Sequence, residues 1–187
     1  KQVTGVDARA GQSRSASRAC LACARLQRAR SDTDPFFLRE LRESVAILHK
    51  HQRYPGWCTL WLKDHAEHLA LLPRERQERL QLDVLDAARA MHAALDVPSR
   101  ELLGAGVPAG PIRINYECLG NVVAHVHWHL IARRAGDPDP GATVWVRPAA
   151  ETDCGCAAGL RDALVAGLRA AMGAPASARG SGRGWWV

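Results

Sequence analysis

The stretch Asn121–Ile131 reads NVVAHVHWHLI and carries three histidines, His125, His127 and His129, at alternate positions. Successive side chains of a β-strand point to opposite faces, so the three imidazoles would share one face and Trp128 would lie on the other. Neighbouring imidazoles are then roughly 7 Å apart along the strand. The pattern predicts a polar row that faces a cleft, carried on an otherwise hydrophobic strand.

Two chemistries use such a row: a metal site built from imidazoles, or phosphoryl transfer through a histidine nucleophile. The preceding residues favour the second. Gly120 and Asn121 can offer backbone amides and a carboxamide to phosphate oxygens. No Asp or Glu occurs between Leu119 and Arg134, which disfavours a carboxylate-rich magnesium site.

The flanking sequence alternates between short apolar runs and helical periodicity. Apolar runs at 44–48 and 57–62 surround Pro55-Gly56 and predict an antiparallel pair of strands. Further strands are predicted at 112–116 and 122–132, and 142–146 can extend back toward the sheet. Apolar residues at three- and four-residue steps predict helices at 73–95 and about 159–172. Without regular βαβ alternation, these elements predict an α+β fold with a mostly antiparallel sheet.

Composition and charge limit the classes of protein to which the chain can belong. The chain has 187 residues, 47% hydrophobic and 24% charged, which is typical of one soluble domain. The net charge of +6 arises within residues 1–30, which hold seven basic residues and one acidic residue. We expect a flexible basic leader at 1–17, a folded domain at 18–147, and a C-terminal helix with a loose tail at 148–187.

Partners and location follow from the same observations. The neutral body argues against a nucleic-acid partner, although a basic arm that touches polyanions stays an alternative. No apolar stretch approaches the roughly 20 residues that cross a bilayer, so no membrane contact is expected. No secretory signal is recognised, and a cytoplasmic location is therefore expected.

The six cysteines are interpreted as thiols or metal ligands rather than disulfides, because a reducing compartment is expected. Cys20 and Cys23 form a C-x-x-C pair. Cys58 and Cys118 are expected to be small buried apolar residues. The remaining C-x-C pair, Cys154 and Cys156, is an alternative second metal site.

The segment Ile114–Arg133 resembles the histidine-triad (HIT) superfamily, whose signature is His-x-His-x-His followed by two apolar residues. The similar residues include Asn115-Tyr116 and Leu119-Gly120-Asn121-Val122-Val123 before the triad. The chain is most similar to the bacterial dinucleoside-polyphosphate-hydrolase-like branch. The resemblance extends upstream through Pro55–Cys58 and Leu62–His65 to Cys20–Cys23, and so covers about 20–147. It implies a sheet of about five strands with the long helix packed on it and an extra C-terminal helix.

The resemblance implies that His127 attacks the α-phosphorus of a nucleotide and forms a nucleotidyl-histidine intermediate, which water or another acceptor resolves. An imidazole is nucleophilic near pH 7 when its other nitrogen donates to a backbone carbonyl. His129 can donate to a phosphate oxygen or the leaving group. Asn121, with the amides of Gly120 and Val122, can hold the developing charge. No catalytic divalent ion is required.

The resemblance also implies a structural zinc with a closed Cys₂His₂ ligand set. The ligands would be Cys20, Cys23, His65 and His125. His68 is the substitute ligand if His65 points away.

Three residues depart from the family pattern. Trp57 stands where many members have a histidine. His49, with His51 nearby, stands where an Asn or Asp commonly holds the ribose hydroxyls, and Val122 replaces a Ser or Thr that contacts phosphate. The expected substrate-binding residues are Asn115, Gly120, Val122, His49 and Trp145.

The sequence thus predicts a nucleotide hydrolase or nucleotidyltransferase that cleaves a phosphoanhydride, phosphosulfate or phosphoramidate bond. The expected partners are a purine nucleotide conjugate as substrate and a second copy of the chain in a homodimer. The alternative is a zinc-stabilised nucleotide-binding or sensor protein with little turnover.

Overall fold

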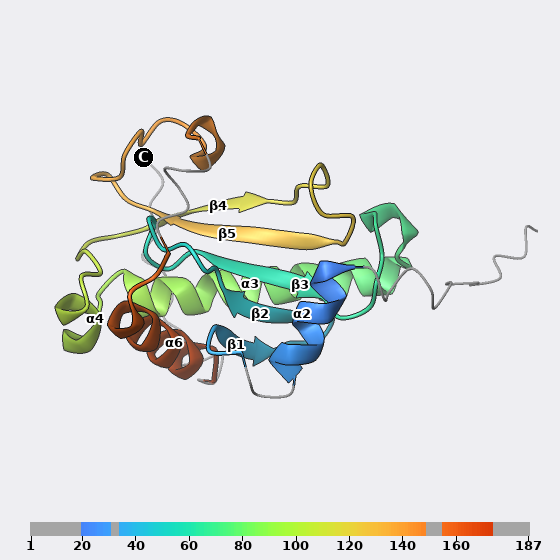
Figure 1. The fold of residues 1–187 in the computed structure, drawn as a ribbon, viewed down its shortest axis with the longest axis horizontal. Helices are drawn as coiled ribbons and strands as arrows, with labels where there is room; N and C mark the ends of the chain where they lie inside the picture. The colour runs from blue at the N-terminus through green and yellow to red at the C-terminus, as the bar shows by residue number, and fades with distance from the viewer. Residues whose placement is uncertain (1–19, 31–33, 149–154, 174–187) are drawn as a thin grey trace, which may run out of the picture.

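The computed structural model describes residues 20–30, 34–148 and 155–173. Its centre is a five-stranded antiparallel sheet in the order β1-β2-β3-β5-β4 (Figure 1). The strands are β1 (Phe37–Glu40), β2 (Ser44–Leu48), β3 (Cys58–Leu62), β4 (Arg113–Glu117) and β5 (His127–Arg133). The helices are α2 (Leu21–Arg30), α3 (Arg74–Leu95), α4 (Arg100–Gly104) and α6 (Ala158–Gly173), with 3₁₀ turns η1 (Leu69–Leu71) and η2 (Val144–Val146).

The two faces of the sheet are covered differently (Figure 1). On one face, α3, α4 and α6 bury the main core, in which Leu60 and Leu130 of the strands meet Met91 of α3. On the other face, Leu26 and Ala29 of α2 pack on β2. This layered arrangement confirms the predicted α+β fold with its antiparallel sheet, long helix and C-terminal helix.

A buried carboxylate fixes the long helix against the β1–β2 turn. Asp83 of α3 is fully buried and accepts hydrogen bonds from the backbone amides of Glu43 and Ser44, at 2.8 and 3.0 Å. The Ser44 hydroxyl also donates to it, at 2.9 Å. Because an unpaired carboxylate would be costly to bury, these donors specify how α3 sits on the sheet.

The Pro55-Gly56 turn delivers Trp57 to the start of β3. Gly56 has a φ of +101°, in the left-handed region that favours glycine. A Cβ at this position would also overlap the side chain of Leu95. The turn therefore requires glycine for both its backbone conformation and its close contact with α3.

The predicted strand pair is confirmed: β2 and β3 pair in register from Ser44↔Leu62 to Leu48↔Cys58. The prediction of a strand at 122–132 is wrong at its beginning, since β5 begins at His127. The amides of His125 and Val126 donate instead to the carbonyls of Val123 and Ala66, each at 2.8 Å. Those bonds take both amides out of a strand ladder.

The segment 142–146 does not return to the sheet as a strand but forms η2. Arg133, at the end of β5, is buried and donates to the carbonyl oxygens of Ala142 and Asp139, at 2.7 and 3.0 Å. These bonds fold the turn back over the sheet. The sequence did not predict α2, α4 or β1 as separate elements.

The predicted leader at 1–17 lies outside the described residues, as do Cys154 and the Trp185-Trp186 pair of the predicted tail. In the part of the chain that the structure describes, none of the helices combines the length and the apolar character of a membrane span.

Candidate active site and metal centre

The three histidines form a buried row on the α2 side of the sheet. His127 and His129 lie at the start of β5, opposite Trp61 and Thr59 of β3, and His125 immediately precedes the strand. The exposed fractions of His125, His127 and His129 are 1%, 5% and 7%. The rings of His127 and His129 are 5.1 Å apart, so one small group can contact both.

His127 has one nitrogen committed to the backbone. Its Nδ1 lies 2.7 Å from the carbonyl oxygen of His125. A carbonyl only accepts, so Nδ1 carries the hydrogen and Nε2 retains its lone pair. Trp61 stacks on the ring at 4.5 Å with an interplanar angle of 11°, and its own Nε1 donates to Thr59 Oγ1 at 2.8 Å. The ring is thus held in the tautomer of a nucleophile.

His129 has the opposite tautomer. Trp57 Nε1 donates to His129 Nδ1 at 3.2 Å, which leaves the hydrogen of the neutral ring on Nε2. Burial, followed by the proximity of His127 and His49, lowers the pKa of His129 to about 3. His129 therefore offers a neutral N–H donor, and Trp57 supplies the bond that orients it.

His49 stacks on the other side of Trp57, with ring centroids 4.0 Å apart. Its ring centre is 5.9 Å from that of His129, so it borders the imidazole row. Burial lowers the pKa of His49 to about 4 and keeps the ring neutral at physiological pH. His51 lies outside the stack, where its Nδ1 accepts from the Gly155 amide at 3.2 Å.

Trp145 of η2 reaches the same site from the β4 side. Its ring meets His129 edge to face at 5.2 Å and Trp57 at 5.6 Å. Its indole N–H donates to the carboxylate of Glu117, which also accepts from Asn115 Nδ2 at 3.4 Å. Sequence analysis did not single out Glu117. Its position two residues after Asn115, on the same face of a strand, is the signal that could have found it.

The four residues predicted as zinc ligands form a second cluster. The ligand atoms of Cys20, Cys23, His65 and His125 all lie within 4.8 Å of one another. Cys20 Sγ and Cys23 Sγ are each 3.6 Å from His125 Nδ1, and Cys23 Sγ is 3.6 Å from His65 Nδ1. In a tetrahedral site with the usual zinc bond lengths, sulfur and nitrogen ligands lie about 3.6 Å apart. The geometry therefore fits a Cys₂His₂ zinc site.

The protonation of the cluster also suits a cation. His125 Nε2 lies 2.8 Å from the Leu62 carbonyl, to which it donates, so Nδ1 keeps its lone pair toward the sulfurs. Burial, followed by the hydrogen bond and the charge of the neighbouring Cys20, raises the pKa of Cys23 to about 11. A bound cation would favour the thiolate form instead. His68 is exposed and does not belong to the cluster, so His65 is the ligand that the geometry supports.

The comparisons with known proteins agree with this geometry. A family model described as the HIT domain matches residues 30–136, more than half of the chain. The chain belongs to the HIT family. No curated protein matches it. HIT membership indicates nucleotide binding, or nucleotide hydrolase or transferase activity, in general terms.

Solved HIT structures share the fold. A histidine triad protein from Marinobacter aquaeolei is 25% identical, with 78% of this chain and 93% of that chain covered and a TM-score of 0.52. A zinc-bound histidine triad family protein from Mycobacterium smegmatis is 19% identical, with coverage of 83% and 94% and a TM-score of 0.52. A hypothetical histidine triad nucleotide-binding protein from Sulfolobus tokodaii is 18% identical, with coverage of 80% and 91% and a TM-score of 0.55.

The loop that enters β5 of the HIT domain holds the other predicted phosphate contacts. Gly120, Asn121 and Val122 are exposed, and the Val122 side chain is 86% exposed. Among the residues that the structure describes, no hydrogen bond joins this loop to the imidazoles.

Cys58 is buried, as expected, but Cys118 is exposed because it follows the end of edge strand β4.

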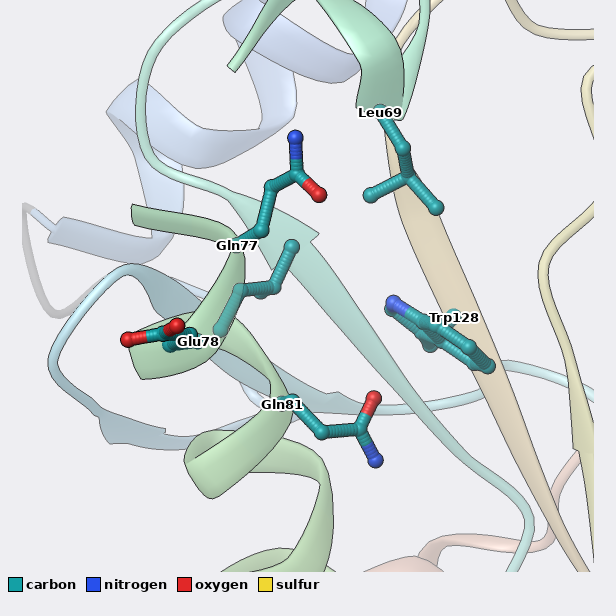
Figure 2. Close-up of a pocket in the computed structure, with 6 residues that line it drawn as sticks. Leu69, Gln77, Glu78, Gln81 and Trp128 are labelled. Carbon is teal, nitrogen blue, oxygen red and sulfur yellow. The ribbon is translucent and has the colours of Figure 1, made fainter. Parts of the chain in front are cut away.

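The HIT domain also has a shallow cavity of about 290 Å³ on the opposite face of β5. Figure 2 shows Trp128 of β5 beside Gln77 and Gln81 of α3, with Leu69 of η1 above them. Because side chains alternate along β5, this cavity lies behind the imidazole row. His127 does not face it, and it plays no part in the candidate active site.

Proposed function

We propose that this HIT protein is a nucleotide hydrolase or nucleotidyltransferase that acts through a covalent nucleotidyl intermediate on His127. The observation that carries the proposal is the 2.7 Å contact between His127 Nδ1 and the His125 carbonyl oxygen. It leaves an uncharged Nε2 lone pair in a buried site beside a second imidazole. An activated, oriented nucleophile of this kind is the requirement for covalent catalysis at phosphorus.

The reaction then has two displacement steps. In the first, His127 Nε2 forms a bond to the α-phosphorus, and the bond to the leaving group breaks with its electron pair. A phosphate or sulfate departs as an anion, whereas an amine takes one proton from solvent. In the second, a water oxygen bonds to phosphorus, the P–N bond breaks back onto Nε2, and a proton is released to solvent. An alternative acceptor in place of water gives transfer.

His129 supports both steps as a neutral donor. Its Nε2–H can bond to a phosphate oxygen as negative charge develops, and burial strengthens that interaction. We assign the same task to Asn121 and to the backbone amides of Gly120 and Val122 in the entry loop. No divalent ion is needed for this scheme.

The nucleoside and the leaving group must extend to different sides of the phosphorus. We assign His49, on the β2 side of the row, to the nucleoside, together with the Trp57 ring on which it stacks. We assign Asn115 and Trp145, on the β4 side, to the leaving-group end of the substrate. The substrate is proposed to be a purine nucleotide conjugate.

The Cys₂His₂ cluster is proposed to hold a structural zinc. Cys20, Cys23, His65 and His125 fit this ion in identity and spacing. Zinc has no open position in such a set, so it would contribute folding energy rather than chemistry. The chain's own contribution is that His125 connects the cluster to His127 through its carbonyl oxygen.

Rapid-quench mass spectrometry tests the nucleophile. Wild type, His127→Ala and the exposed control His68→Ala would each be mixed with adenosine 5′-phosphosulfate, a dinucleoside polyphosphate and an adenosine 5′-phosphoramidate. We expect wild type and the control to release adenosine monophosphate and to carry a nucleotidyl adduct on the His127 peptide. His127→Ala should be slower by about a thousandfold or more.

Equal release by wild type and His127→Ala, or an adduct on another side chain, would contradict the proposal. Tight nucleotide binding by wild type without any turnover would support the alternative, a zinc-stabilised nucleotide-binding protein.

A further inference from the structure

A carboxylate borders the site in which an anionic phosphorus group would react. Glu117 of β4 is the cross-strand partner of His129, and its side chain lies on the face of the imidazole row, where it holds Trp145. A negative charge beside a bound phosphate repels it, so a carboxylate at this position disfavours anionic groups. Among the described residues, no Lys or Arg forms an ion pair with Glu117, so the charge is not neutralised by a neighbouring cation.

The carboxylate and the indole together form one wall of the site. Trp145 is 47% exposed, so part of its ring is open to a ligand. The neighbouring Val144 is 1% exposed and packs with Trp57 and Ile131, which anchors η2 on the sheet. Each Glu117 oxygen accepts one hydrogen bond and keeps further acceptor capacity. The wall therefore offers an aromatic ring and an acceptor charge, held in fixed positions.

We infer that Glu117 and Trp145 form the leaving-group subsite, and that this subsite selects a leaving group bearing an ammonium group over one that continues as further phosphates. The inference rests on the proposed function, which places the nucleoside on the His49 side of the row. The leaving group must then extend toward β4, where these two residues stand.

The selectivity has a simple electrostatic origin. An ammonium group is attracted both to the indole ring and to the carboxylate. Both contacts are partly exposed, so together they favour a charged leaving group by about tenfold. A second and third phosphate in the same position would be repelled by Glu117, and the subsite would discriminate against them.

Two matched probes isolate the charge. Adenosine 5′-phosphoramidates of 1,3-diaminopropane and of n-butylamine have leaving groups with the same number of heavy atoms, but only the first ends in an ammonium group. We expect the wild-type kcat/KM to be about tenfold higher for the ammonium probe. Glu117→Gln keeps an acceptor oxygen for the Trp145 indole and should lower the ratio of the two kcat/KM values about threefold, because the attraction of the ammonium group to the Trp145 ring remains.

A dinucleoside polyphosphate gives a prediction of the opposite sign. Removing the charge with Glu117→Gln should raise kcat/KM for this anionic substrate while it lowers kcat/KM for the ammonium probe. The matched control is Glu75→Gln, an exposed carboxylate on α3, which should keep the wild-type ratio. If Glu117 only positions Trp145, the variant would lower all three values together and leave the ratio unchanged, which would overturn the inference.

Failure of the subsite and failure of the proposed function give different results. If wild type cleaves both phosphoramidates equally and needs His127, the subsite is wrong and the proposed function stands. If wild type cleaves neither phosphoramidate and also releases no adenosine monophosphate from adenosine 5′-phosphosulfate or the dinucleoside polyphosphate, the proposed function fails. Equilibrium binding of both phosphoramidates to wild type then tests the subsite alone. A preference of about tenfold for the ammonium probe would then support it, whereas equal affinities would overturn it.

Discussion

Lowering the pH from 8 to 5 should destabilise the folded protein in part through a single imidazole, His129. Burial lowers the pKa of His129 from 6.5 to about 3, and the Trp57 indole donates to the nitrogen that would have to take up the proton. The unfolded chain has no such constraint and protonates near its ordinary value. Between these two pKa values, the unfolded state binds one more proton than the folded state, so stability rises with pH.

The magnitude follows from the distance in pH from the unfolded pKa. At pH 5 the unfolded imidazole is about 1.5 pH units below its pKa of 6.5, and each unit costs about 1.4 kcal/mol. The loss is therefore about 2 kcal/mol at pH 5 relative to pH 8. Any folded pKa below about 4 gives nearly the same loss at this pH. His49 acts in the same direction.

A difference measurement isolates His129 from the release of zinc, which also weakens the protein in acid. The free energy of unfolding of wild type and His129→Gln would be measured by urea denaturation at pH 8 and pH 5. The variant should lose about 2 kcal/mol less than wild type over this interval. The control His68→Gln changes an exposed histidine and should keep the wild-type pH dependence. Equal pH dependence for wild type and His129→Gln would refute the assignment of His129 as a buried neutral donor.

Two other substitutions test the metal cluster and the orienting bond. Wild type should contain one zinc per chain. Cys20→Ala should lose the zinc, and its unfolding midpoint should be about 5–10 °C below that of wild type. A wild-type protein that is folded but free of metal would contradict this expectation. Trp57→Phe keeps an aromatic ring beside His49 but removes the hydrogen bond to His129, which is worth about 1 kcal/mol. We therefore expect kcat/KM to fall about fivefold and the His129 pKa, measured by NMR, to rise. Unchanged kcat/KM and unchanged pKa would remove Trp57 from the mechanism.

The local sequence was sufficient for features that depend on residue spacing. The alternation of His127 and His129 placed their imidazoles on one face of β5 without knowledge of the neighbouring strands, whereas His125 lies before the strand begins. The periodicity of residues 73–95 similarly located the helix that became α3, Arg74–Leu95. Both predictions rest on the geometry of one element, which the sequence of that element largely determines.

Features that depend on register could not be obtained in this way. Trp61 stacks on His127 because β3 pairs with β5 in one register, and Glu117 lies beside His129 because β4 pairs with β5 in another. A shift of one residue would move each side chain to the other face. Trp57 was identified only as a missing histidine, whereas the structure shows that its indole sets the tautomer of His129.

The late start of β5 also has a physical reason that joins the two candidate sites. His125 would continue the strand if its amide stayed in the ladder, but that amide bonds to Val123 and the side chain turns toward the two cysteines. In this conformation its carbonyl oxygen lies 2.7 Å from His127 Nδ1. One residue therefore contributes its ring to the metal cluster and its backbone to the nucleophile. A change that displaces His125 from the cysteines should thus alter the tautomer balance of His127 as well as stability, which makes the cluster a positioning device for the candidate active site.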